Sequence, residues 1–151
     1  MPKRDDERHR TSQHCVRRKF VTYLDVPETK LVFFKEDDGT VPALAWLISL
    51  PEDARDKGWR ALRQLALHGY DLRRPLQDTL RNGVHELRWR LGHVNYRILF
   101  TIEQRTIALL EAGLTKEDVV PSKEIDRAAT RAAKWRTSPS RYSYEKEKDD
   151  E

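Results

Sequence analysis

The chain has 151 residues, of which 36% are charged, and a formal net charge of +4. This length suits one domain with an ordinary hydrophobic core, and the mildly basic balance permits nucleic-acid binding without establishing it. No apolar run approaches the roughly 18 residues of a membrane span, and the N-terminus lacks the apolar stretch of a signal peptide. Cys15 is the only cysteine and excludes an internal disulfide, so we expect a cytoplasmic protein.

Both ends of the chain differ in composition from its centre. Residues 1–19 are polar, with seven Lys or Arg against three acidic residues, and such a segment cannot bury enough apolar surface to become ordered. It is either a solvated leader or an arm that follows nucleic acid. We expect a folded domain over 20–135 and a disordered charged tail over 136–151.

The first half of the domain predicts one strand and two helices. The apolar segment around Leu31 to Phe34 predicts a strand over about 30–36. Pro42 then suits the first turn of a short helix over 42–49, which ends at Leu50-Pro51. A second helix over about 52–68 follows, because its apolar residues recur at helical spacing and Gly69 suits its end.

The segment from Val84 to Gly113 predicts three consecutive strands. It follows a polar connection that ends at an Asn82-Gly83 turn. Gly92-His93 suits a two-residue hairpin loop of type II′, because glycine readily adopts the positive φ that this loop requires. That loop would place Trp89 opposite Tyr96 and Arg88 opposite Arg97.

The predicted register sorts the hairpin residues into two faces, because side chains alternate along a strand. Leu87, Trp89, Tyr96, Ile98 and Phe100 form an apolar face. The other face carries Glu86, Arg88, Arg90, Asn95, Arg97 and Leu99.

Arg88 and Arg97 would then face each other, which is unfavourable for like charges unless a partner or ligand compensates. Glu86 is one possible partner, and Glu111 is another if the next turn brings it beside Arg97. The alternative is that the two guanidinium groups are held for phosphate, which arginine binds through paired hydrogen bonds. The pattern leaves both interpretations open.

A last helix is predicted after Pro121, with an apolar stripe at Ile125, Ala128, Ala129 and Ala132. The order is then β-α-α-β-β-β-α. This order favours an α+β fold in which a small antiparallel sheet is packed on one face by helices. The opposite face, with Arg88 and Arg97, would be open.

Three pieces of the sequence carry a further pattern: AWLISLPEDARDKGWRALRQLALHG, GVHELRWRLGHVNYRILFTIEQRTIALLEAG and TKEDVVPSKEIDRAATRA. Together they resemble the RelE/HigB superfamily of toxins from bacterial and phage toxin–antitoxin modules, especially its phage-derived HigB-like branch. The matching family elements are an F-L-x-x-L-P-x-x-x-R-x-K helix pair, a G-L-x-E-L-R…Y-R-x-x-Y hairpin and a K-K-T…P-x-x-E-I-x-x-A ending.

The resemblance implies a RelE-like fold and an endoribonuclease, or mRNA interferase, that cleaves mRNA, commonly on the ribosome. A helix-turn-helix antitoxin of the HigA type would silence it. The family reaction uses no metal or cofactor: the 2′-OH attacks the adjacent phosphate. The sequence likewise shows no cluster with metal-ligand spacing.

The resemblance also implies site residues. Arg88 matches the arginine of the family's E-L-R strand, Arg97 that of its Y-R strand, and Lys116 the second lysine of K-K-T. We expect the arginines to bind phosphate and stabilise the transition state, and Lys116 to stabilise charge or carry a proton. The expected substrate-binding residues are Arg90, Asn95, Arg73 and Arg74.

Some residues depart from the family pattern. Gly113 stands where the family has an aromatic residue and Thr115 where it has the first lysine, while Glu117 and Asp118 add acidic charge. An alternative is therefore a non-catalytic module that binds RNA, the ribosome or a protein through the same basic face. A further alternative is a purely protein-directed role, in which neither arginine would matter.

Overall fold

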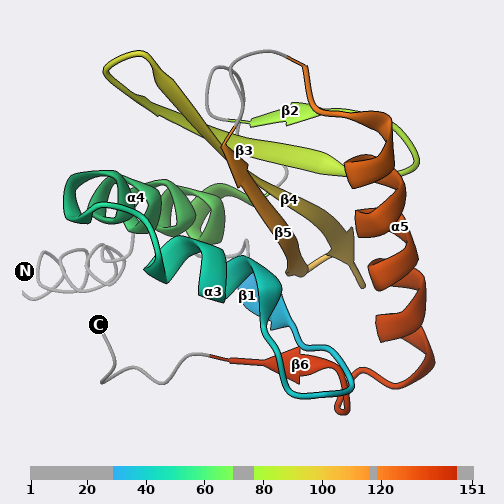
Figure 1. Ribbon diagram of the computed structural model, residues 1–151. Helices are drawn as coiled ribbons and strands as arrows, with labels where there is room; N and C mark the ends of the chain where they lie inside the picture. Colours follow the sequence, from blue (N-terminus) through green and yellow to red (C-terminus); the bar gives the residue numbers. More distant parts are fainter. Residues whose placement is uncertain (1–28, 70–76, 116–118, 146–151) are drawn as a thin grey trace, which may run out of the picture.

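The computed structural model describes residues 29–69, 77–115 and 119–145. One six-stranded sheet, in the order β2-β3-β4-β5-β1-β6, lies at its centre (Figure 1). The chain runs through β1 (Lys30–Phe34), α3 (Pro42–Ile48), α4 (Glu52–His68), β2 (Gln77–Thr79), β3 (His85–Leu91), β4 (Val94–Glu103), β5 (Ile107–Thr115), α5 (Ser122–Thr137) and β6 (Ser143–Tyr144). The α+β class and the predicted order are confirmed, with β2 and β6 as short additional strands.

The helix boundaries follow from local chemistry. Pro42 opens α3, where its missing N–H would have no partner inside the helix. Pro51 separates α3 from α4, and Glu52 and Asp53 fill the first turn of α4, where carboxylates favour the helix dipole. Gly69 ends α4 with φ 56, a backbone angle that glycine adopts readily. The predicted helices therefore lie where expected.

The sheet is mixed rather than fully antiparallel. β1 pairs with β5 in parallel, with Leu31 opposite Ala108, while the other strand pairs are antiparallel. The continuous apolar run in β1 is typical of a strand buried on both faces. Phe33 packs into the core under α3 and α4, whereas Phe34 packs on the α5 side.

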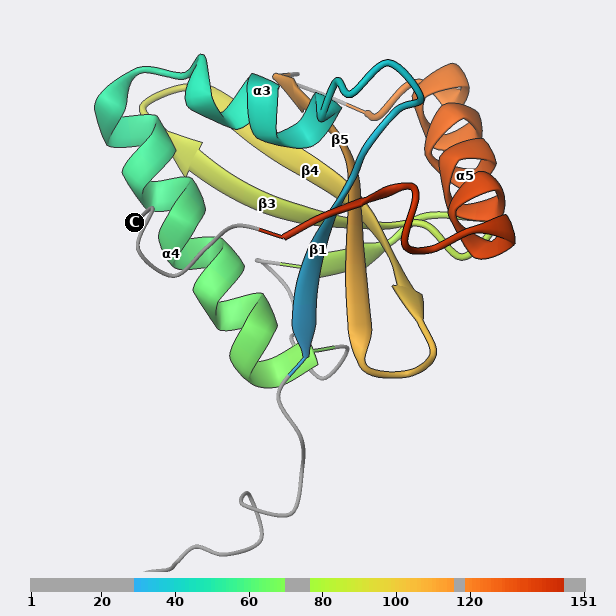
Figure 2. The same ribbon diagram turned by 90° about the horizontal axis from the view of Figure 1, so that it is seen from below.

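Helices cover both faces of the sheet, so the prediction of helices on one face only is wrong. α3 and α4 lie on one side and α5 lies on the other (Figure 2). Ile125 and Ala128 of α5 pack with Leu99 and Leu114 of the sheet. The physical reason is the apolar stripe of α5, which must be buried and finds a second apolar face on β1, β4 and β5.

The region after α5 also differs from the predicted disordered tail. Tyr142 is 6% exposed, and its ring stacks on Phe34 with centroids 5.9 Å apart. Ser143 and Tyr144 then pair with β1 as strand β6. Aromatic burial thus orders residues that look polar in sequence. Within the described part of the chain, no helix is long and apolar enough to cross a membrane.

Candidate functional site

The β3–β4 hairpin has the predicted loop and register. A type II′ loop requires a positive φ at its first residue and not at its second. Gly92 has φ 64, and His93 is not among the residues with positive φ. Leu91 pairs with Val94, Trp89 with Tyr96 and Arg88 with Arg97. Trp89 and Tyr96 are buried in the core with α3 and α4, so the arginine pair lies on the opposite face.

Glu86 compensates the facing arginines. One carboxylate oxygen, Oε1, lies 2.9 Å from Nε of Arg97, and the other, Oε2, lies 3.3 Å from Nη1 of Arg88. Glu111 is not the partner of Arg97, because Leu114 stands opposite Arg97. At the β-bulge, Leu99 pairs with Ala112 and Phe100 with Leu110, so the register passes over Glu111. The neutralising role considered for Glu86 is therefore confirmed.

The three side chains differ in their access to solvent. The Arg88 side chain is 29% exposed, whereas those of Arg97 and Glu86 are 7% and 5% exposed. Arg88 is thus the most accessible of the three side chains, whereas Arg97 and Glu86 are buried. Asp78 of β2 pairs with Glu86 across the strands and adds a second carboxylate to this face.

Arg90 and Asn95, two expected substrate-binding residues, face each other nearer the loop. The Arg90 guanidinium donates from Nε to the Gly92 carbonyl at 3.0 Å. Lys57 of α4 donates from Nζ to the Arg90 carbonyl at 2.7 Å, which blocks part of the outer edge of β3. The other expected residues, Lys116, Arg73 and Arg74, lie outside the described residues.

The ring side chains near this hairpin have packing partners. Tyr96 stacks on Trp89 with centroids 5.9 Å apart. His85 stacks on Phe100, and its Nδ1 lies 3.1 Å from both Gln77 Nε2 and Thr79 Oγ1. Burial lowers the pKa of His85 below its usual value, which favours the neutral imidazole. These geometries suit a structural role.

Two carboxylates, Glu103 and Glu111, form a buried network that the sequence did not reveal. The Thr101 hydroxyl oxygen lies 2.8 Å from Oε2 of Glu103 and 2.7 Å from Oε2 of Glu111, and Glu111 is 0% exposed. Arg136 donates to Glu103 through Nε and Nη2, both at 2.8 Å. One hydroxyl hydrogen cannot serve two ionised carboxylates, and burial raises the pKa of Glu111 well above its usual value. We therefore assign the proton to Glu111, which donates to Thr101.

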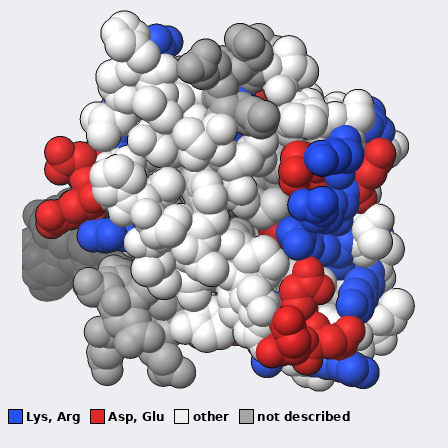
Figure 3. Space-filling model, viewed as in Figure 1, with Lys and Arg blue, Asp and Glu red and all other residues white. Residues whose placement is uncertain are grey.

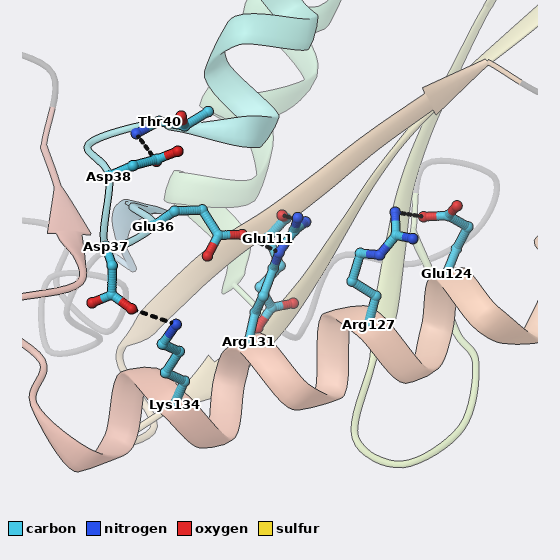
Figure 4. Close-up of polar contacts among 9 residues, drawn as sticks. All are labelled: Glu36, Asp37, Asp38, Thr40, Glu111, Glu124, Arg127, Arg131 and Lys134. Carbon is cyan, nitrogen blue, oxygen red and sulfur yellow. Dashed lines mark hydrogen bonds and ion pairs between the residues drawn. The ribbon is translucent and has the colours of Figure 1, made fainter.

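A row of ion pairs joins α5 to its surroundings. Figure 3 shows charges of both signs gathered on the side formed by α5, and Figure 4 shows how they pair. The pairs are Arg127 with Glu124 at 3.5 Å, Arg131 with Glu36 at 3.1 Å and Lys134 with Asp37 at 2.8 Å. The contact with Lys134 lowers the pKa of Asp37 and raises that of Lys134. This row links the β1–α3 turn to α5 and differs from the hairpin, where two arginines share one carboxylate.

The family of the chain is shown by comparison with known proteins. Residues 45–133 match the family described as phage derived protein Gp49-like (DUF891), and this span is more than half of the 151 residues. The chain belongs to the Gp49-like family. Gp49-like proteins are a phage-derived toxin family of the RelE/HigB type, and a toxin of this type implies an antitoxin partner. No curated protein matches the chain.

The structure accounts for one unusual residue of this Gp49-like chain. A Cβ built on Gly113 would overlap the indole ring of Trp46. Trp46 also packs edge-on against Trp89, with centroids 5.8 Å apart. The ring from α3 therefore takes the space that an aromatic residue at position 113 would need, and the departure is compensated by packing.

Metal-ligating side chains are not grouped in the described ranges of this Gp49-like protein. No set of three or more His, Cys, Asp or Glu residues there is arranged to hold a metal ion. Glu103 and Glu111 are joined through Thr101, and Glu103 also accepts hydrogen bonds from Arg136. The hairpin face carries Arg88 and Arg97, and guanidinium groups suit an anionic ligand.

Proposed function

We propose that this Gp49-like toxin is a metal-independent endoribonuclease of the HigB-like branch. It cleaves mRNA on the ribosome, and a helix-turn-helix antitoxin silences it. The observation that carries the proposal is the directly opposed pair Arg88 and Arg97, held by Glu86 on one face of the hairpin. Guanidinium groups bind phosphate oxygens in pairs, and they stabilise charge that develops during phosphoryl transfer.

The reaction follows from RNA itself. The 2′-oxygen attacks the adjacent phosphorus in line, the bond to the 5′-oxygen breaks, and the products are a 2′,3′-cyclic phosphate and a 5′-OH. Arg88, the more exposed arginine, contacts the non-bridging oxygens. The charge of the buried Arg97 attracts the phosphate more strongly than an exposed charge would, because the local dielectric is low. Lys116 completes the site as a charge stabiliser or proton carrier. Arg90, Asn95, Arg73 and Arg74 bind neighbouring nucleotides.

Growth and mRNA integrity test this proposal. The wild-type chain, Arg97→Ala and Lys116→Ala are induced separately in cells that lack a cognate antitoxin. We expect growth arrest and mRNA cleavage with the wild type, and relief of both by either substitution. Normal growth with intact mRNA, despite folded wild-type protein, would overturn the nuclease proposal.

The burial of Arg97 favours a second candidate, a binding module that uses the same face without cleavage. A guanidinium with 7% exposed side chain has little direct access to a ligand. The acidic residues Glu117 and Asp118 beside Lys116 in the sequence point in the same direction. RNA or ribosome binding that weakens steeply with salt, without any cleavage product, would support this candidate.

A further inference from the structure

Glu86 has a place in the site that simple neutralisation does not require. Its carboxylate contacts Arg88 and Arg97 with one oxygen each and is nearly enclosed, with 5% side-chain exposure. We propose that Glu86 is a positioning residue, which holds both guanidinium groups in the orientation that the substrate phosphate needs. This inference rests on the proposed nuclease function and assigns a role within that same site.

The backbone makes Glu86 suitable for this role. Glu86 lies in β3 between two paired strands, opposite Asp78 of β2 and Leu99 of β4. Strand residues with neighbours on both sides are held more firmly than loop residues, and rigid supports keep a site in its productive geometry. Arg88 is two residues away on the same face, and Arg97 lies diagonally across the ladder.

The charge of Glu86 distinguishes positioning from binding. A carboxylate inside a cationic site weakens the attraction for RNA, because it removes positive charge at the place where phosphate binds. A site optimised for binding alone would gain from a neutral residue here. Arg88 and Arg97, however, would repel each other and lose their common anchor without the carboxylate. Glu86 therefore lowers the affinity for RNA but fixes the orientation of the two guanidinium groups.

The two effects separate in kinetics. Glu86→Gln keeps the size of the side chain and removes its charge, so RNA binding should be unchanged or tighter while the chemical step slows. We expect KM to stay level or fall and kcat to fall about 10- to 100-fold, the range that small misplacements of reacting groups cause. If Glu86→Gln only destabilised the fold, the fraction of active protein would fall and RNA binding would not become tighter.

The experiment compares the full-length wild type with three variants in cleavage of mRNA on programmed ribosomes. Glu36→Gln is the matched control, because it removes one carboxylate that pairs with an arginine, Arg131, away from the hairpin. Glu86→Asp keeps the charge but is one methylene too short to reach both arginines. It should show a lower kcat with unchanged KM, and it serves if Glu86→Gln does not fold.

A second readout does not depend on cleavage. The Nε–Hε NMR signals of Arg88 and Arg97 report how firmly each guanidinium is held. We expect both signals to broaden or disappear in Glu86→Gln and to persist in Glu36→Gln. If the wild type cleaves no RNA, the nuclease proposal fails, whereas unchanged arginine signals in Glu86→Gln overturn the positioning role.

The outcomes are distinct. The proposal is overturned if folded Glu86→Gln keeps the kcat and KM of Glu36→Gln, or if the two arginine signals are unaffected. It is equally overturned if kcat falls only in proportion to the unfolded fraction. Active wild type, a reduced kcat without weaker binding in Glu86→Gln, and loss of the arginine signals together establish the positioning role.

Discussion

At the scale of single residues, the protonation of Glu111 follows from hydrogen-bond arithmetic. Thr101 has one hydrogen for two carboxylates, and Glu103 already accepts two hydrogen bonds from Arg136. Glu111 is fully enclosed, so water cannot stabilise its charge. Burial is the main cause that raises its pKa, and the charge of Glu103 adds to this, whereas the charges of Arg136 and Arg131 oppose it. The neutral acid is the form that fits the folded protein.

This protonation makes stability depend on pH. Folded Glu111 keeps its proton at pH values where the unfolded chain, with a pKa near 4.5, has released it. Stability from this group is therefore complete below the unfolded pKa and falls as pH rises toward the folded pKa, by at most about 1.4 kcal/mol per pH unit. Glu111→Gln cannot titrate, yet its amide can still donate to Thr101. Urea unfolding from pH 5 to 8 should show a smaller decline in this variant than in the wild type.

The control for this prediction is Glu124→Gln, which removes a carboxylate at the surface of α5. It should retain the decline seen in the wild type. Identical pH profiles for the wild type and Glu111→Gln would show that Glu111 is ionised in the folded protein.

At the scale of elements, the Trp46–Gly113 contact couples α3 to β5. Gly113→Phe should destabilise the wild type by about 1–3 kcal/mol or more, because the new ring meets Trp46. In a Trp46→Ala background the same substitution fills the vacated space and should cost less. A double-mutant cycle from chemical unfolding should give a coupling energy of about 0.5–3 kcal/mol. Additive effects would mean that the two positions do not share this space.

Helices and the hairpin were predictable from the sequence because the residues that determine each of them lie close together in the chain. The Gly92-His93 loop fixed the hairpin register and placed Arg88 opposite Arg97 correctly. The geometry of the candidate site was partly predictable: Arg88, Arg97 and Glu86 lie together as expected, since all three belong to one hairpin. The parallel β1–β5 pair and the packing of α5 on the second face join segments that are far apart in the sequence. Hydrophobic periodicity and turn residues predict only local structure, so neither feature was predicted.

The last strand shows the same limit. Pro139 and the serines around it suggested a disordered tail, yet Tyr142 is buried against Phe34. Tyr142→Ala should lower the free energy of unfolding by about 2–4 kcal/mol, as expected for loss of a buried aromatic ring. Arg141→Ala, at an exposed neighbouring residue, should have a much smaller effect in the same unfolding measurement. Equal effects would contradict an ordered C-terminal segment.

At the scale of the whole molecule, two groups of charge lie on the same face of the sheet, because α5 packs on Leu114, which pairs with Arg97. α5 carries cations that are paired with carboxylates of the β1–α3 turn and of its own helix (Figure 4). The hairpin carries Arg88 and Arg97, which share Glu86. The Gly113–Trp46 packing and the covering helix α5 make this hairpin a firm support. The fold thus presents the arginines on a rigid strand pair, as positioning of a phosphate requires.

The chemistry of the RNA ends tests the nuclease account most directly. Purified wild-type protein and Arg88→Ala are incubated with mRNA on programmed ribosomes, with chelator added in amounts that leave the ribosomes intact. We predict wild-type products with 2′,3′-cyclic phosphate and 5′-OH ends, and at least a 100-fold loss of rate in Arg88→Ala, about 2.7 kcal/mol of transition-state stabilisation. Products with 5′-phosphate ends, or an Arg88→Ala variant as active as the wild type, would contradict the account.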